Sequence, residues 1–166
     1  MKIIILLLVS SIFLRLEASD LSPESIKSHF NKEHENCFAI KEIGVKKIFI
    51  FKESQCKKRE TPYSTYKILH SLIALETRAI KGDKTIIKWD GKKKFLKSWE
   101  KDHNINTAIR HSVVPFFQET AKRIGKLRMS KYLSLIKYGN QKVGDKIDRF
   151  WLDGPLKVSA LSLIHI

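Results

Sequence analysis

The sequence has few cysteines and no cluster of metal-ligating side chains. It contains 2 Cys and 6 His in 166 residues, and the histidines do not group with cysteines or acidic residues at ligand spacing. A protein metal site needs several such ligands close together. The composition therefore argues against a bound metal. It leaves Cys37 and Cys56 as candidates for a disulfide, a pairing that spacing alone leaves open.

Acidic residues are scarce as well. The chain has 17 Asp and Glu against 32 Lys and Arg, a formal net charge of +15. Such a charge is compatible with an acidic partner such as nucleic acid or an anionic membrane. The lysines are scattered, however, and no basic stripe alternates with stacking aromatic residues. We therefore favour lysines on solvated faces over a basic interaction protein, and we expect no nucleic-acid partner.

Long hydrophobic runs are absent after the N-terminus. Lys2, the apolar run from Ile3 to Leu14 and the small residue Ala18 together predict a secretory signal peptide over residues 1–18. The run is too short for a comfortable transmembrane helix, and no cysteine follows it as a lipid anchor. We expect a periplasmic or secreted chain with no stable membrane span. That oxidising compartment would allow the two cysteines to pair.

The remaining chain is long enough for one domain with a hydrophobic core. Two β-rich runs, 36–41 and 46–52, flank Gly44 and predict an antiparallel hairpin. A polar loop over 53–62 leads to an apolar helix over 62–76, which we expect to be buried. Trp89-Asp90-Gly91 is a turn signal. Further helices are expected from Pro23 and over 105–111, 115–124 and 127–137, with Gly125 as a C-cap.

Ser64 and Lys67 stand one helical turn apart at the start of the apolar helix. A serine hydroxyl is a weak nucleophile unless a neighbouring base takes its proton. A lysine on an apolar helix is desolvated, which lowers its pKa and favours a neutral, basic amine. The pair therefore indicates nucleophilic catalysis. The structural alternatives are that Ser64 is only an N-cap and that Lys67 extends to solvent.

Three further elements follow: Ser112-Val113-Val114, Tyr138-Gly139-Asn140 and Phe150-Trp151-Leu152. Taken singly, Ser112 could cap the helix break before Pro115, and Trp151 could be core packing. In this order and spacing after Ser-Thr-Tyr-Lys, the elements resemble the class D β-lactamases, which are penicillin-recognising serine hydrolases. The resemblance implies an α+β fold in which an antiparallel sheet packs with helices, next to a helical subdomain.

The resemblance also implies the activity and the roles. Ser64 would attack a β-lactam antibiotic, a penicillin or cephalosporin, and form an acyl-enzyme, with its own N–H in the oxyanion hole. Lys67 would act as the general base after carbon dioxide converts it to N6-carboxylysine, with no other cofactor. Trp151 would donate its indole N–H to that carbamate. Ser112 would relay a proton to the lactam nitrogen.

The other residues of the resemblance have supporting roles. Val114 would help to form the dry wall around Lys67 and to bind substrate with Ser64 and Ser112, and Tyr138 to Asn140 would be a structural loop. Whether the protein dimerises is left open.

One element of the family is lacking. Class D enzymes carry a Lys-Thr/Ser-Gly strand roughly fifty residues beyond the position of Trp151, and this sequence ends at Ile166. Residues 161–166 also match a translation of a transposon-end adapter used in sequencing libraries. We therefore expect a partial domain over 19–160 with its C-terminal strands missing, followed by a non-native tail. The alternatives to hydrolysis are a β-lactam sensor domain that stays acylated and an inactive fragment.

Overall fold

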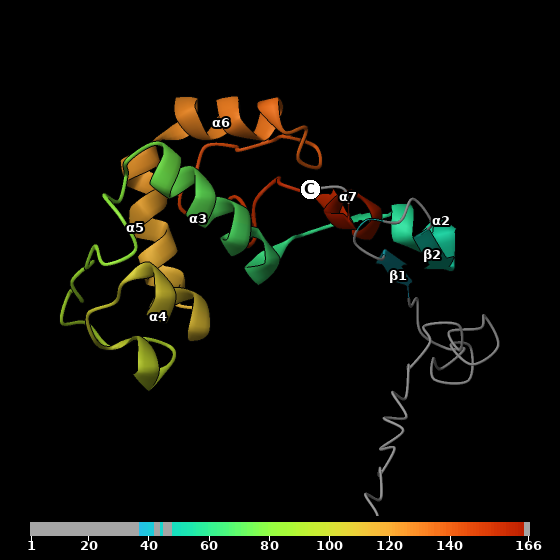
Figure 1. Ribbon diagram of the computed structural model, residues 1–166. Helices are drawn as coiled ribbons and strands as arrows, with labels where there is room; N and C mark the ends of the chain where they lie inside the picture. Colours follow the sequence, from blue (N-terminus) through green and yellow to red (C-terminus); the bar gives the residue numbers. More distant parts are fainter. Residues whose placement is uncertain (1–36, 42–43, 45–47, 165–166) are drawn as a thin grey trace, which may run out of the picture. The chain divides into compact units, whose positions relative to one another are not determined.

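The computed structural model describes residues 37–41, 44 and 48–164 (Figure 1). The predicted signal peptide and the short helix expected from Pro23 lie outside the described residues. The periplasmic or secreted location therefore stays a prediction. Within the described residues, no helix combines the length and the apolar character needed to cross a membrane.

The predicted hairpin is present. Strands β1 (Phe38–Lys41) and β2 (Ile48–Phe51) pair antiparallel, with Phe38 opposite Phe51 and Lys41 opposite Ile48. Both strands are rich in β-branched and aromatic residues, which suits a pleated, half-buried surface. The hairpin thus follows directly from the local sequence.

The segment after the hairpin is more ordered than predicted. In place of a loop over 53–62, the chain forms helix α2 (Glu53–Lys57) and strand β3 (Arg59–Glu60). A disulfide joins Cys56 in α2 to Cys37 beside β1. Strand β3 pairs antiparallel with β4 (Val158–Ser159), about a hundred residues later. These contacts join residues that are distant in the sequence, so no local sequence pattern predicts them.

The serine-containing helix has two parts. A 3-10 turn, η2 (Tyr63–Thr65), precedes helix α3 (Tyr66–Glu76). The prediction that this helix is buried nearly all round is wrong, because Ile68 is 67% exposed and Leu72 is 61% exposed. One stripe is buried, containing Tyr66, His70 and Ile73 at helical spacing. Helix α3 packs through contacts with α4 and α5.

Helices α4 (Ile105–Arg110), α5 (Val114–Ile124) and α6 (Lys126–Leu135) lie within two residues of the predicted boundaries. Asn104 accepts a hydrogen bond from the Thr107 backbone N–H and caps α4. Gly125 ends α5 with φ of 78°, a conformation that glycine adopts without strain. Helix α5 contacts α3, α4 and α6, and is the central helix of this group (Figure 1).

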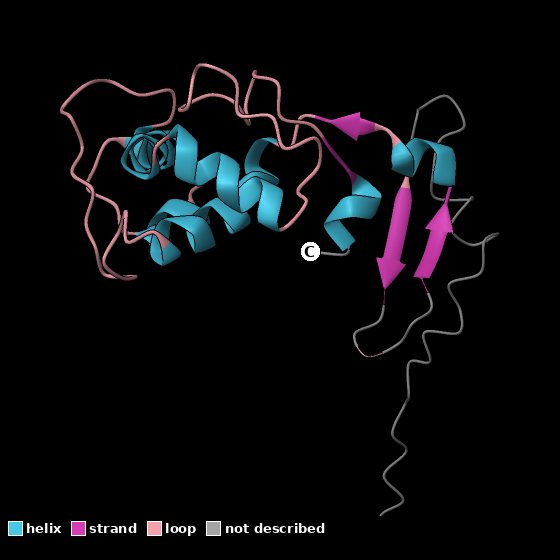
Figure 2. Ribbon diagram, turned by 90° about the horizontal axis from the view of Figure 1, so that it is seen from above, coloured by secondary structure: helices cyan, strands magenta, loops and turns pink. Residues whose placement is uncertain are grey.

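Helices and antiparallel strand pairs together make an α+β fold, as the resemblance predicted. The hydrophobic core extends over α3 to α6 and the segment that carries Phe150, Trp151 and Leu156. Residues 160–164 form helix α7 (Ala160–Ile164), which contacts β1 and α2 (Figure 2). The adapter origin of residues 161–166 stays a prediction.

Candidate active site

Ser64 lies in the tight 3-10 turn that leads into α3, and its side chain is exposed. Two hydrogen bonds fix this turn. The Tyr63 backbone N–H donates to the Trp151 carbonyl at 3.1 Å, and the Thr65 hydroxyl donates to the Pro62 carbonyl at 2.6 Å. Tyr63 also adopts a positive φ of 46°, a strained conformation for a non-glycine residue. The turn therefore presents Ser64 in a defined position next to the Trp151 segment.

The amine of Lys67 lies within hydrogen-bonding distance of both serines. Lys67 is only 3% exposed, and its Nζ is 3.0 Å from Ser64 Oγ and 2.5 Å from Ser112 Oγ. The Nζ also donates to the Ser112 carbonyl at 2.8 Å. Three acceptors satisfy the three donors of an ammonium group. When the amine loses a proton, the same geometry allows the Ser64 hydroxyl to donate to Nζ.

Ser112 lies in the short connection between α4 and α5. Its φ of 50° is in the left-handed region, which is a strained conformation for a residue other than glycine. Residues with such backbone strain are common at functional sites. The Ser112 backbone N–H donates to the Ile109 carbonyl at 3.1 Å, and the Trp99 indole N–H donates to the His111 carbonyl at 3.0 Å. These bonds hold the connection so that Ser112 Oγ lies 2.9 Å from Ser64 Oγ.

Burial changes the chemistry of the Lys67 amine. It lowers the pKa of Lys67 from 10.5 to about 8, because the surroundings disfavour the charged form. The amine also lies over the Phe117 ring, with 5.7 Å between Nζ and the ring centroid. An amine with this pKa exists partly in the neutral form near pH 8. It can therefore accept a proton from Ser64.

Trp151 is fully buried inside a cluster of aromatic rings. Its ring centroid lies 5.1 Å from Phe150, 5.2 Å from His70 and 5.9 Å from Tyr66. Its indole N–H has no hydrogen-bond partner among the described residues. A buried donor without a partner is costly in free energy, so such a group often serves a ligand or a modified side chain.

The predicted wall residue, Val114, is half-buried at the first position of α5. The apolar contact to the Lys67 amine that the structure shows comes from Phe117, one turn further along the same helix. Phe117 was not among the residues singled out from the sequence. The signal that could have found it is the buried stripe of α5, which repeats at helical spacing through Phe117, Thr120, Ala121 and Ile124.

Tyr138 to Asn140 form a tight connection to the segment that follows Trp151. Asn140 Nδ2 donates to the Pro155 carbonyl at 2.7 Å, and Asn140 Oδ1 accepts from the Lys157 N–H at 3.0 Å. Gly139 approaches the backbone so closely that an added Cβ would lie 2.1 Å from the Lys157 carbonyl oxygen. These residues hold the segment that follows Trp151. Among the described residues, none of their hydrogen bonds goes to Ser64 or Lys67.

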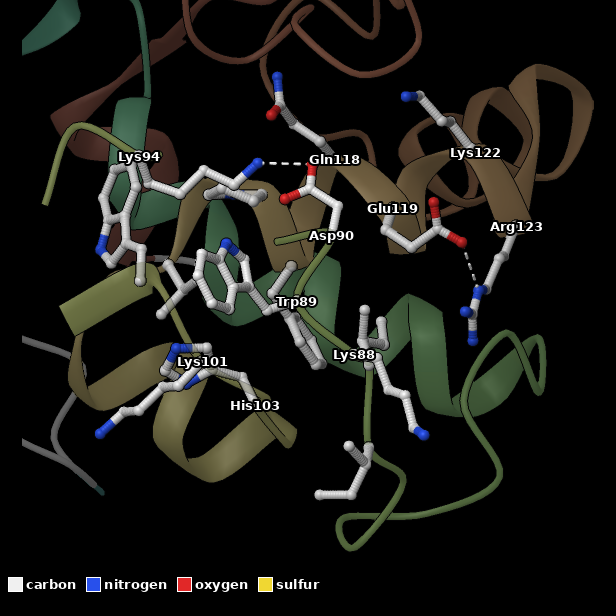
Figure 3. A pocket seen from close by; sticks show the side chains of 16 residues that line it. Lys88, Trp89, Asp90, Lys94, Lys101, His103, Gln118, Glu119, Lys122 and Arg123 are labelled. Carbon is white, nitrogen blue, oxygen red and sulfur yellow. Dashed lines mark hydrogen bonds and ion pairs between the residues drawn. The ribbon is translucent and has the colours of Figure 1, made fainter. Parts of the chain in front are cut away.

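An open cleft of about 530 Å³ lies on another part of the surface, between residues 86–103 and α5. Val113 and Pro115, one and three positions after Ser112, belong to its lining, but Ser64 and Lys67 do not. Figure 3 shows Asp90 paired with Lys94 and Glu119 paired with Arg123 in its walls. Within the described part of the chain, no three His, Cys, Asp or Glu side chains gather in a way that could hold a metal ion.

Comparison with known proteins shows which family the chain resembles. Residues 21–166 match the family described as Transpeptidase, the penicillin-binding protein transpeptidase domain. The chain is 50% identical over 103 residues to Beta-lactamase OXA-5 of Pseudomonas aeruginosa, which covers 62% of this chain and 39% of that protein. It is 46% identical over 103 residues to Beta-lactamase OXA-48 of Klebsiella pneumoniae, with the same coverage of both.

Solved structures show the same relationship. The class D β-lactamase BAT-2 matches with a TM-score of 0.78 and 35% identity, over 87% of this chain and 59% of that one. FUS-1 (OXA-85) of Fusobacterium nucleatum subsp. polymorphum matches with a TM-score of 0.79 and 35% identity, over 86% and 59%. These matches confirm the resemblance seen in the sequence. The chain spans about two fifths of the length of the curated relatives.

Proposed function

The chain belongs to the penicillin-binding protein transpeptidase domain family, and on that basis we propose that it carries the acylation centre of a class D β-lactamase. The observation that carries the proposal is the contact of Lys67 Nζ with Ser64 Oγ at 3.0 Å and with Ser112 Oγ at 2.5 Å. A nucleophile, a base and a second hydroxyl within hydrogen-bonding distance are the parts that acyl transfer requires. The substrates would be penicillins and cephalosporins.

The proposed acylation moves one proton and exchanges one bond. Ser64 Oγ attacks the β-lactam carbonyl carbon, while the Ser64 proton passes to the neutral amine of Lys67. The new ester bond to Oγ forms as the lactam C–N bond breaks. Ser112 gives its proton to the departing nitrogen and takes the proton from the Lys67 ammonium in exchange, so that Lys67 ends neutral. The Ser64 backbone N–H, in the first turn of the helix, would stabilise the developing oxyanion.

Two observations support a carbamate on Lys67. A neutral amine is needed to take up carbon dioxide, and burial lowers the pKa of Lys67 to about 8. A buried carbamate also needs hydrogen-bond donors, and the Trp151 indole N–H is a buried donor without a described partner. Bound as a carbamate on Lys67, carbon dioxide would supply an anionic base for acylation and for release of the product, which an ammonium group cannot be.

A chromogenic cephalosporin tests the proposal. We expect hydrolysis by the full-length protein, stimulated by bicarbonate and lost in Ser64→Ala and Lys67→Ala. Ser54→Ala, which removes an exposed serine hydroxyl from α2, is the matched control and should leave hydrolysis unchanged. One stoichiometric burst without turnover would instead support a sensor that stays acylated. A folded protein that shows no turnover and no burst would contradict the proposal.

A further inference from the structure

His70 is a buried histidine that the proposed chemistry does not use. It lies on α3 one turn after Lys67 and has no exposed surface. Its imidazole contacts three aromatic rings, with centroid distances of 5.2 Å to Phe117, 5.2 Å to Trp151 and 5.6 Å to Tyr66. One of these rings, Phe117, contacts the Lys67 amine, and another, Trp151, carries an indole N–H without a partner among the described residues.

Thr120 on α5 is the hydrogen-bond partner of the imidazole. His70 Nε2 lies 3.0 Å from the Thr120 hydroxyl oxygen, and the same hydroxyl lies 3.0 Å from the Phe117 carbonyl. His70 Nδ1 has no hydrogen-bond partner among the described residues. Burial lowers the pKa of His70 to about 3, which keeps the ring neutral.

The contact between His70 and Trp151 is edge to face, with an angle of 88° between the rings. Such a contact stabilises a ring orientation without using a hydrogen bond. The Trp151 N–H and His70 Nδ1 consequently both stay without partners, although the two rings touch. His70 is itself bonded to Thr120, so the imidazole connects α5 to the indole ring, which Phe150 and Tyr66 also contact.

We propose that His70 is a positioning residue for the Lys67 base. Thr120 holds the imidazole, and the imidazole holds the Trp151 indole in the orientation that leaves its N–H available to a carbamate on Lys67. The inference rests on the proposed function, since it concerns the same base. It adds two residues, His70 and Thr120, that act through Trp151 and do not touch the substrate.

Carbon-13 NMR of the purified chain with labelled bicarbonate tests the inference without requiring hydrolysis. The quantity to measure is the bicarbonate concentration that gives half of the maximal Lys67 carbamate signal. Thr120→Val keeps the side-chain shape and removes the hydrogen-bond partner of His70 Nε2. We expect the half-saturating concentration to rise about fivefold, the effect of losing one neutral hydrogen bond. His70→Leu, which removes the ring, should raise it further.

Thr77→Val is the matched control, because it removes a threonine hydroxyl at the other end of α3, where Thr77 bonds to the Ile73 carbonyl at 2.7 Å. A purely structural role for Thr120 would lower the melting temperature of its variant and leave the half-saturating concentration unchanged. The inference would be overturned if the folded Thr120→Val and His70→Leu variants had the same half-saturating bicarbonate concentration as the original chain. An equal rise of that concentration in Thr77→Val would also overturn it.

A failure of the proposed base gives a different pattern. The unmodified chain would then show no carbamate signal that depends on Lys67. This result would overturn the role of His70 together with the carbamate, while acylation of Ser64 by a penicillin would remain a separate, directly measurable property.

Discussion

The hydroxyl oxygens of Ser64 and Ser112 lie 2.9 Å apart, although 48 positions separate the two residues in the sequence. The contact closes because η2 is bonded to the Trp151 segment and the connection between α4 and α5 is held by Trp99. Lys67 donates to both hydroxyls from the first turn of α3. The three side chains therefore act as one unit, and changes in any of them should affect acylation more than folding.

Removing the Ser112 hydroxyl should slow acylation strongly. In Ser112→Ala, the relay to the lactam nitrogen is lost while the backbone and Ser64 remain, so we expect labelling by a fluorescent penicillin to slow about a hundredfold. The measurement is the labelling rate of the folded variant. Ser130→Ala, which removes a hydroxyl from α6, is the control. A labelling rate equal to that of the unmodified chain would contradict the role of Ser112.

The labelling rate should rise with pH. Burial lowers the pKa of Lys67 from 10.5 to about 8, so below that pH most of the amine is ammonium and cannot accept the Ser64 proton. Above it the amine is neutral and competent. We expect a single rise centred near pH 8 when labelling is measured over a pH series. A rate that is independent of pH would argue that Lys67 is not the proton acceptor.

The indole N–H of Trp151 should be needed to retain carbon dioxide on Lys67. Trp151→Phe keeps an aromatic ring and removes the donor, so the bicarbonate needed for half-maximal carbamate formation should rise about fivefold or more. Trp89→Phe is the control, since Trp89 is partly exposed and its indole N–H donates to the Lys92 carbonyl at 2.8 Å. The two variants behaving alike would exclude a specific role for Trp151.

Gly139 should tolerate no side chain. A Cβ at this position would lie 2.1 Å from the Lys157 carbonyl oxygen, and its φ is 51°. Gly139→Ala should therefore lower the free energy of unfolding by about 2 kcal/mol or more, through backbone strain and displacement of the Trp151 segment. Gly82→Ala, where an added Cβ meets nothing within 4 Å, should be close to neutral. Urea denaturation of both variants distinguishes these outcomes.

Local signals in the sequence were sufficient for much of the fold. The hairpin follows from two β-rich runs around Gly44, and α5 follows from Pro115 at its start and Gly125 at its end. Helix α2 and strand β3 were missed because each is short and depends on distant partners, Cys37 and β4 respectively. A five-residue helix cannot be stable through its own propensity.

The candidate site was predicted only where its residues form a spaced pattern. Ser64, Lys67 and Ser112 were found in this way, and the structure brings them within hydrogen-bonding distance of one another. His70 and Thr120 were missed, because their hydrogen bond joins α3 to α5 across 50 positions. The same limit explains the exposed Ile68, since an apolar residue in a sequence does not reveal what packs against it.

The most direct test of the proposed acylation centre is peptide mapping after exposure of the chain to benzylpenicillin. Tandem mass spectrometry would locate any covalent adduct on the digested chain. We predict one penicilloyl group on Ser64, absent in Ser64→Ala and present in Ser54→Ala. A folded chain with no adduct, or with an adduct on Ser112 that persists in Ser64→Ala, would contradict the assignment of Ser64 as the nucleophile.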